Sequence, residues 1–191
     1  MRLKLSSRVS SYMNRLKRCT DCDLRTCCRQ VVPGGGSVPA DILFQGIAPG
    51  KSEDLLGEPF VGPSGRLLNE LIDDACRIDK IDKRVLKIFK TNSVLCRSSI
   101  LDPDSDKFNN NADPTEAQIL ACMPKVVKLI RMVKPKLIIF CGRLPEKFYQ
   151  KSFPDAVEIH HPSYLLKDGG VESRYYRQNV RKLAEALEIF K

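Results

Sequence analysis

Two cysteines near the start of the chain have the spacing of a metal-binding turn. Cys19 and Cys22 are separated by two residues, so both sulfurs can reach one metal centre from a single turn. Such a pair supplies half of a four-ligand site. Spacing alone does not choose the other ligands from the remaining cysteines, which are Cys27, Cys28, Cys76, Cys96, Cys122 and Cys141. The first residues lack the apolar core of a secretion signal, which favours a reducing compartment and metal ligation over disulfides.

A second candidate for chemistry is the glycine- and proline-rich stretch "GIAPGKSEDLLGEPFVGPSGRLL", residues 46–68. It follows an apolar run that predicts a strand over 41–48, and it leads into helical spacing over 65–78. Loops at the carboxyl ends of strands in open α/β sheets leave a crevice, and helix N-termini there offer free N–H groups. The stretch therefore predicts a ligand site.

The remaining elements must bring such loops to one edge. Apolar, β-rich runs predict further strands within 85–95, 136–142 and 156–161, and helical spacing predicts helices over 115–133 and 145–151. A basic amphipathic helix is expected before Cys19, and the polar loop 101–116 should end in an N-cap before Ala117. Tyr176, Val180, Leu183, Ala184 and Leu187 give the last segment, 173–191, one apolar face. Alternating strands and helices predict a small parallel sheet with helices on both faces.

Composition and charge limit the number of domains and the kinds of partner that the chain is expected to have. A chain of 191 residues, 42% of them hydrophobic, can bury one core, so we expect a single domain over 1–191 with an N-terminal cysteine turn at 19–28. Its 32 Lys and Arg against 23 Asp and Glu give a net charge of +9, which favours a polyanion such as nucleic acid, although a merely basic protein is about as compatible with charge alone. No apolar run approaches the roughly 20 residues of a membrane span. We expect a monomer in the cytoplasm or associated with the nucleoid.

Several separated motifs carry a family resemblance in their chain order. "CTDC", "VVPGGG", "GIAPGKSEDLLGEPFVGPSG", "TNSVLCRS", "ACMP" and "HHPSYLL" span residues 19 to about 167. Together they resemble the uracil-DNA glycosylase superfamily, and specifically its iron–sulfur family 4. The resemblance implies a three-layer α/β/α fold with a four-stranded parallel sheet. It also implies hydrolysis of the N-glycosidic bond of deoxyuridine in DNA, as in base excision repair, with replication or repair proteins as further partners.

The resemblance also implies roles for individual residues. Phe60 would stack on a flipped uracil, because a base inside a duplex is out of reach of the enzyme. Asn92 would accept from uracil N3–H and donate to O4, a pair of contacts that cytosine cannot make. His161 would donate to O2 as the leaving base gains charge, and His160 beside it is expected to be structural. The first motif contributes the substrate-binding positions Gly46, Ile47 and Ala48.

DNA contacts and a metal centre are implied in the same way. Ser64 and Ser163 are expected to contact DNA, and Leu165 and Leu166 lie where the superfamily inserts an apolar wedge into the gap left by the flipped base. The ligands of a 4Fe–4S cluster, with a structural role, would be Cys19, Cys22, Cys96 and Cys122. Zinc is the rival that spacing does not exclude.

One departure from the family pattern bears on catalysis. Family 4 usually has a glutamate directly after the first glycine of this motif, and this chain has Ile47, which cannot deprotonate water. Glu53, which we take as the catalytic candidate, and Asp54 are the nearby acidic residues. The departure keeps open a catalytically weak DNA-binding or replication-associated module, and a glycosylase for another modified pyrimidine. A phosphate-binding α/β protein is disfavoured, since GxxxxGK[ST] is absent.

Overall fold

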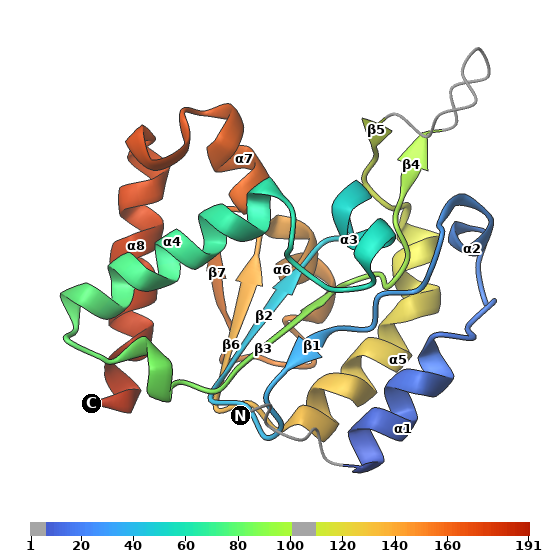
Figure 1. The fold of residues 1–191 in the computed structure, drawn as a ribbon, viewed down its shortest axis with the longest axis horizontal. Helices are drawn as coiled ribbons and strands as arrows, with labels where there is room; N and C mark the ends of the chain where they lie inside the picture. The colour runs from blue at the N-terminus through green and yellow to red at the C-terminus, as the bar shows by residue number, and fades with distance from the viewer. Residues whose placement is uncertain (1–6, 101–109) are drawn as a thin grey trace.

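The computed structural model describes residues 7–100 and 110–191, and it centres on a parallel sheet (Figure 1). Four strands run in the order β3-β2-β6-β7, all parallel to their neighbours. They are β3 (Ile88–Asn92), β2 (Ile42–Gly46), β6 (Leu137–Cys141) and β7 (Val157–Ile159). The prediction of a four-stranded parallel sheet is confirmed. A fifth short strand, β1 (Gly35–Gly36), joins the outer edge of β3 in the antiparallel direction and had no sequence signal.

The register of the two strands that carry the motifs decides where the site forms. All five residues of β2 are buried, as a strand covered on both faces requires. In the β2–β3 pairing, Gly46 lies opposite Asn92. Both strands therefore end at the same edge, and the glycine-rich loop and the asparagine motif leave the sheet side by side.

Helices cover both faces of the sheet, as predicted. One face carries α1 (Ser7–Leu16), α5 (Glu116–Val133) and α6 (Arg143–Tyr149), which share one apolar cluster with the strands. The other carries α4 (Pro63–Ile78) and α8 (Arg174–Leu187), which form a second cluster with their own side of the sheet. In Figure 1 the first group lies mainly to the right and the second to the left. The three-layer α/β/α class is confirmed.

Helix boundaries follow the local signals. Thr115 is the N-cap of α5, and its hydroxyl accepts from Gln118 N–H in a capping box, as the expected N-cap before Ala117 requires. The closing helix is α8 followed by a 3₁₀ turn, η3 (Glu188–Phe190). The expected first helix is α1; residues 1–6 and most of the loop expected at 101–116, namely 101–109, lie outside the described residues.

Several short elements were not predicted, and they flank the motifs. They are α2 (Leu24–Cys27), α3 (Lys51–Leu56), α7 (Pro162–Lys167), the hairpin of β4 (Ser99–Ile100) and β5 (Asn110–Asn111), and the 3₁₀ turns η1 (Lys83–Val85) and η2 (Gly170–Glu172). Elements of two to six residues carry too few periodic positions to be read from sequence. Within the described part of the chain, no helix combines the length and apolarity that crossing a membrane requires.

Candidate active site

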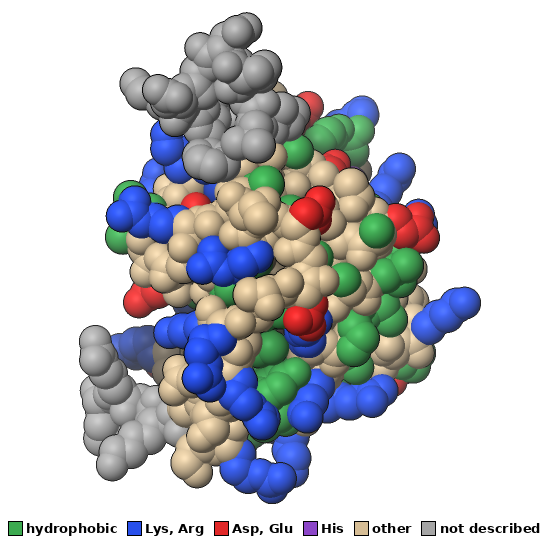
Figure 2. Space-filling view, turned by 90° about the vertical axis from the view of Figure 1, so that its right-hand side faces the viewer, with side chains coloured by type: hydrophobic (Ala, Val, Ile, Leu, Met, Phe, Trp, Pro, Cys, Tyr) green, Lys and Arg blue, Asp and Glu red, His purple; other side chains and the backbone are tan. Residues whose placement is uncertain are grey.

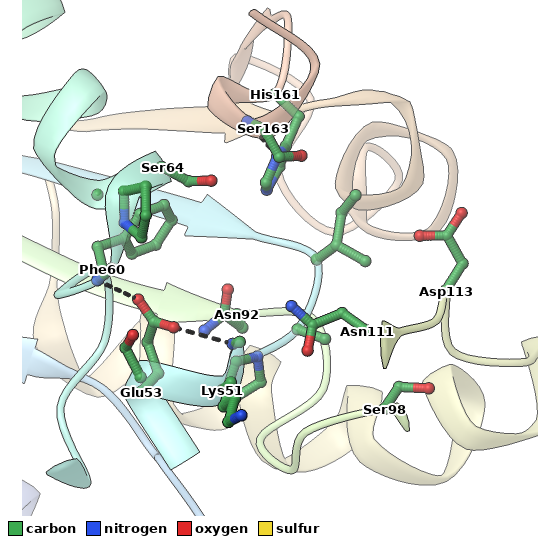
Figure 3. Close-up of a pocket in the computed structure, with 18 of the residues that line it drawn as sticks. Lys51, Glu53, Phe60, Ser64, Asn92, Ser98, Asn111, Asp113, His161 and Ser163 are labelled. Atoms are coloured by element: carbon green, nitrogen blue, oxygen red, sulfur yellow. Dashed lines mark hydrogen bonds between the residues drawn. The ribbon is translucent and has the colours of Figure 1, made fainter. Parts of the chain in front are cut away.

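A pocket of about 270 Å³ opens at the carboxyl ends of β2 and β3 (Figure 3). Its wall includes the loop after β2 with the start of α3, the loop leading into α4, the end of β3 with Ser98 beyond it, the β5 side of the hairpin, and the start of α7. In Figure 3, Phe60, Asn92 and His161 surround the central space from three sides. The site predicted from the sequence is therefore assembled in one place.

Gly46 leaves the space in which two of these side chains meet. A Cβ built on Gly46 would lie 2.4 Å from Asn92 Oδ1 and 2.8 Å from Phe60 Cζ. Both distances are below what real Cβ atoms tolerate, and both neighbours are buried. The glycine is therefore required by the close approach of the amide and the ring, which supports the predicted assignment of Gly46 to the base-binding wall.

The Asn92 side chain is buried without a protein partner. It is 3% exposed and lines the pocket. No hydrogen bond joins its amide to any residue that the structure describes. Its polar atoms face the pocket and are not sealed inside the core, and most polar side chains this little exposed have a protein partner. An amide held open toward a pocket in this way is built for a ligand that offers both a donor and an acceptor.

Phe60 is held in a left-handed backbone conformation. Its φ is 56°, which is unusual for a residue with a large side chain, and the side chain is 8% exposed. A Cβ on Gly65 would lie 2.0 Å from the Phe60 carbonyl oxygen, so only glycine lets the start of α4 close over this loop. The backbone thus fixes the ring at the wall of the pocket.

The Glu53 carboxylate secures the same loop. Oε1 accepts from Val61 N–H at 2.9 Å and Gly62 N–H at 2.7 Å, and Oε2 accepts from Gly50 N–H at 3.1 Å. Three of its roughly four acceptor positions are therefore occupied by backbone. Glu53 spans both ends of the loop that carries Phe60, which is a positioning geometry; the catalytic role predicted for it stays a prediction.

The second acidic residue of this segment is engaged elsewhere. Asp54 is buried, and its carboxylate accepts from Arg29 N–H at 2.9 Å and Gln30 N–H at 3.1 Å. The contacts tie α3 to the segment that follows the cysteine turn. Asp54 therefore has a structural explanation and does not face the pocket.

His161 is poised as a neutral donor. Burial lowers its pKa to about 4, while the Asp113 carboxylate acts in the opposite direction, so the ring is uncharged at pH 7. The Ser163 backbone N–H donates to Nδ1 at 3.1 Å, and Ser163 Oγ lies 2.6 Å from the same atom. Because a backbone N–H can only donate, Nδ1 is the unprotonated nitrogen and the proton sits on Nε2. The neutral ring therefore keeps one N–H to donate.

The adjacent histidine has a different environment. The Asn179 amide oxygen accepts from His160 N–H at 3.1 Å and lies 2.9 Å from His160 Nδ1, while Asn179 Nδ2 donates to the His160 carbonyl at 3.1 Å. Hydrogen bonds to Asn179 thus hold His160 against α8, and its ring does not line the pocket described above. This placement agrees with the structural role expected for it.

The residues predicted to contact DNA differ in their exposure to solvent. Ser64, at the N-terminal turn of α4, and Ser163 line the rim of the pocket. Leu166 is 40% exposed, whereas Leu165 is fully buried in the cluster between α4 and α8. The physical reason is the periodicity of α7, which turns consecutive residues to different faces. Only Leu166 is therefore free to act as a wedge.

Ile47 and Ala48 occupy the first motif as predicted, and an unpredicted carboxylate stands near them. Ile47 lines both this pocket and a larger neighbouring hollow, and so does Asp113. Asp113 is exposed, and no described residue donates a hydrogen bond to its carboxylate. In Figure 3 it lies on the side of the pocket opposite Phe60. Its only sequence signal was membership in a polar loop.

A buried arginine holds the segment that places Asp113 at the pocket. Arg97 is 4% exposed and its Nε donates to Asn111 Oδ1 at 2.8 Å. Asn111 lies on β5 and also lines the pocket. Residues 111–113 thus reach the site through the β4–β5 hairpin, which no local pattern indicated.

The four predicted cluster ligands gather beside α5. Cys96 and Cys122 are buried, and Cys19 and Cys22 are partly buried. The pKa of Cys122 is raised to about 11, chiefly by burial, and the neighbouring thiols Cys22 and Cys19 act in the same direction. The pKa of Cys96 is raised chiefly by its interaction with the Cys28 thiol and by burial, and the thiols of Cys122 and Cys22 act in the same direction. Thiols that perturb one another in this way are near neighbours, and a set of four fits the donor chemistry of an iron–sulfur cluster or of zinc.

The thiol arrangement also includes a fifth cysteine. Cys28, expected to be spare, interacts with the Cys96 thiol, and this interaction lowers the pKa of Cys28 to about 7. Cys76 and Cys141 are buried in the opposite apolar cluster, as expected for structural thiols. Among the residues that the structure describes, no three Cys, His, Asp or Glu side chains are already arranged to hold a metal ion.

Positive charge gathers away from the pocket as well as near it. Figure 2 shows Lys and Arg side chains crowding the lower part of the face that carries α1 and α5. A groove there is lined by Arg8, Arg15, Lys128, Arg131 and Lys134, and no acidic residue of the described chain lines it. At the pocket itself the cations are Lys51 and, in the neighbouring hollow, Arg143. The net charge of +9 is thus spread over both ends of the sheet.

A three-layer α/β/α protein with a base-sized pocket at the carboxyl edge of its sheet is the class that fold and site define. The sequence pattern described as "Uracil DNA glycosylase superfamily" matches residues 33–188. The chain therefore belongs to the uracil-DNA glycosylase superfamily.

Individual relatives narrow this to one branch, type 4. The chain is 34% identical over 173 residues to the type-4 uracil-DNA glycosylase of Saccharolobus solfataricus, covering 86% of this chain and 66% of that protein. The Sulfurisphaera tokodaii enzyme of the same name is 32% identical over 87% of this chain and 76% of its own. That of Thermotoga maritima is 30% identical over 84% of each. The family 4 resemblance stated from the motifs is confirmed, and the chain spans about two thirds of the first relative's length.

Proposed function

We propose that this chain hydrolyses the N-glycosidic bond between uracil and deoxyribose in DNA, leaving an abasic site. The observation that carries the proposal is the unpartnered, 3% exposed amide of Asn92, held beside the Phe60 ring in a pocket whose third side is His161. The proteins it resembles over most of its length are named uracil-DNA glycosylases. The proposal extends that activity to this chain.

Base selection follows from the amide. Asn92 can accept from uracil N3–H and donate to O4, so uracil satisfies the amide that the fold leaves unsatisfied. Cytosine offers an acceptor at N3 and a donor at N4, which reverses the pattern. Phe60 supplies a stacking face fixed by its loop, so the flipped base meets a preorganised wall.

Leaving-group stabilisation falls to His161. As the C1′–N1 bond breaks, its electron pair moves onto uracil, and the sugar becomes oxocarbenium-like. The Nε2–H of the neutral ring can donate to O2 with growing strength as negative charge develops there. Because Nδ1 is already held by Ser163, the ring does not have to change tautomer during the reaction.

Water must then reach C1′, and Asp113 is the carboxylate that we assign to it. Ile47 occupies the position of the family's glutamate, and Glu53 is largely committed to backbone N–H groups. Asp113 lines the same pocket with no donor from the described protein. The water oxygen bonds to C1′ as uracil departs, and Asp113 accepts the proton and passes it to solvent.

A 4Fe–4S cluster on Cys19, Cys22, Cys96 and Cys122 is proposed as a structural group. When bound, it would tie the N-terminal turn to the start of α5 through Fe–S bonds. The protein already links these parts: Lys125 Nζ lies 2.6 Å from Asp21 Oδ2, and Gln118 Nε2 donates to Asp23 Oδ1 at 2.9 Å. These contacts support the proposal, because they join the two segments that such a cluster would bridge.

A second candidate function is a DNA-binding module that retains the pocket with weak catalysis. One observation favours it: Ile47 replaces the usual glutamate, and the carboxylate of Glu53, the acidic residue of the first motif that lines the pocket, is committed to backbone N–H groups. Binding of uracil-DNA without base release would support this module. Asp113 is the feature that favours catalysis.

The test is direct. Purified protein is incubated with a uracil-containing oligonucleotide, and alkali then cleaves any abasic sites. We expect cleavage at uracil that His161→Ala slows about 100-fold or more, as loss of an oxyanion donor does elsewhere. A cytosine-containing strand of the same sequence is the control. Equal release of both bases, or none from uracil, would contradict the proposal.

A further inference from the structure

A second hollow adjoins the uracil pocket. It has a volume of about 670 Å³, and it shares the Ile47, Asp113 and His161 walls with the smaller pocket. Its far side is formed by the start of α6 and the aromatic side chains of α7 and α8. The proposed reaction uses the smaller pocket for one base, so this larger space is left without a role.

Three rings form what we call the aromatic shelf of this hollow: His160, Tyr164 and Tyr175. The centroids of His160 and Tyr175 are 4.8 Å apart, those of Tyr164 and Tyr175 are 5.5 Å apart, and those of His160 and Tyr164 are 6.0 Å apart. Tyr164 is 47% exposed, and Tyr175 is partly exposed. Rings that served only to fill a core would not be left open beside a hollow.

Neighbouring side chains hold two rings of the aromatic shelf in place. Asn179, which is 1% exposed, holds the His160 backbone and ring through three contacts of 2.9–3.1 Å. On the outer side, the Arg174 guanidinium lies 4.6 Å from the Tyr175 centroid, and its Nη2 donates to Tyr175 Oη at 2.6 Å. The rings are therefore preorganised for a planar ligand before it arrives.

The hollow also provides polar edges and a place for phosphate. Glu158 lines it, with its carboxylate 3.5 Å from Lys182 Nζ, and can accept from amino groups of a base. Arg143 lines it and offers a guanidinium, as Arg174 does at the outer edge. Aromatic faces combined with guanidinium groups are the usual means of binding unpaired bases and their backbone.

We propose that the aromatic shelf binds a second, unpaired nucleotide of the DNA strand that carries the uracil, so that the protein prefers single-stranded DNA to duplex. The shared walls place this nucleotide next along the strand from the flipped base. A base stacked on protein rings cannot remain stacked and paired in a duplex, so a duplex must lose a pair to use the shelf. The inference rests on the proposed function only for placing this nucleotide beside a flipped uracil. Binding of an unpaired base to the shelf can be tested without uracil.

The first experiment measures binding alone. Fluorescence anisotropy compares a labelled 12-nucleotide strand that lacks uracil with the duplex of the same sequence. We expect Tyr164→Ala and Tyr175→Ala to weaken single-strand binding roughly 5- to 100-fold, the range for loss of one base–aromatic stack, with duplex binding within about twofold of the parent protein. Tyr175→Phe keeps the ring and loses only the hydroxyl contact with Arg174, so it should bind much closer to the parent than Tyr175→Ala does. Ile189→Ala, at an exposed apolar residue outside the hollow, is the surface control.

The second experiment reports stacking directly. 2-Aminopurine is placed on the 5′ or the 3′ side of a 2′-fluorodeoxyuridine, whose glycosidic bond resists cleavage. We expect the 2-aminopurine fluorescence to fall when the parent protein or Tyr175→Phe binds a strand with the probe at one of these two positions. Binding of Tyr175→Ala should not lower the fluorescence at either position.

The outcomes separate the two ideas. Equal losses on single strand and duplex, a Tyr175→Phe defect as large as that of Tyr175→Ala, or unchanged 2-aminopurine fluorescence at both positions would overturn the shelf. A parent protein that shows the Tyr-dependent single-strand binding but releases no uracil would refute the proposed function and leave the shelf standing. Tyr164→Ala removes an exposed side chain, so a folding defect in Tyr175→Ala does not block the test.

Discussion

Replacing Asn92 should have different effects on the stability of the fold and on recognition of the base. The side chain is 3% exposed and has no hydrogen-bond partner among the described residues. Removing the amide breaks no hydrogen bond within the described protein, so it should not lower the free energy of unfolding. Because the residue borders an open pocket, Asn92→Ala enlarges that pocket and creates no closed cavity. We therefore expect a melting temperature equal to or above that of the parent.

Activity should move in the opposite direction. Asn92→Asp keeps the shape of the side chain, loses the donor to uracil O4 and places an acceptor there. Loss of one charged or buried hydrogen bond of this kind corresponds to about 2–3 kcal/mol, or roughly a 30- to 150-fold fall in kcat/KM. Single-turnover release of uracil from a labelled oligonucleotide measures the loss, and thermal unfolding followed by circular dichroism measures stability.

Either of two results would contradict these expectations for Asn92. A fall in melting temperature of more than about 4 °C in Asn92→Ala would correspond to 1 kcal/mol or more and would show that the amide supports the fold. Full uracil release by Asn92→Asp would show that the base is selected by another group.

The remaining predictions concern water, protons, the metal centre and charge. Asp113→Asn should slow uracil release at least tenfold if this carboxylate accepts the proton, and Ile47→Glu in that background should restore it; a normal rate for Asp113→Asn would exclude the assignment. Since the folded pKa of His161 is about 4 and thus below its usual 6.5, the neutral ring favours the folded state, and this stability is lost as pH falls from about 6.5 to 4. The loss should reach about 3 kcal/mol, and denaturant unfolding of His161→Gln should lack that part of the pH dependence, whereas an unchanged profile would contradict it. Anaerobically purified protein should be brown with about four irons per chain, Cys122→Ser should lose iron and Cys141→Ser should keep it, while colourless protein with stoichiometric zinc would refute the cluster. Affinity for undamaged DNA should fall steeply as salt rises, because phosphate contacts release counterions, and a flat dependence would count against nucleic acid as the partner.

Local sequence patterns determined the scaffold and the motif positions. Four apolar runs became the four parallel strands, and the N-cap signal at Thr115 started α5 as predicted. These features depend on neighbours within a few residues, so periodicity and capping chemistry suffice to read them. The order of the separated motifs, from the cysteine pair to "HHPSYLL", was enough to indicate the family.

The tertiary structure decided what each side chain in the site faces. Glu53 looked like a free carboxylate, but the folded loop gives it three backbone N–H donors. Leu165 and Leu166 looked equivalent, but packing between α4 and α8 buries only the first. Asp113 lay in the predicted polar loop and Tyr175 in the predicted closing helix, and no local pattern showed that the fold brings them beside His161 and Tyr164. Such contacts join residues far apart in the chain, and they depend on how strands register and helices pack, which no local pattern contains.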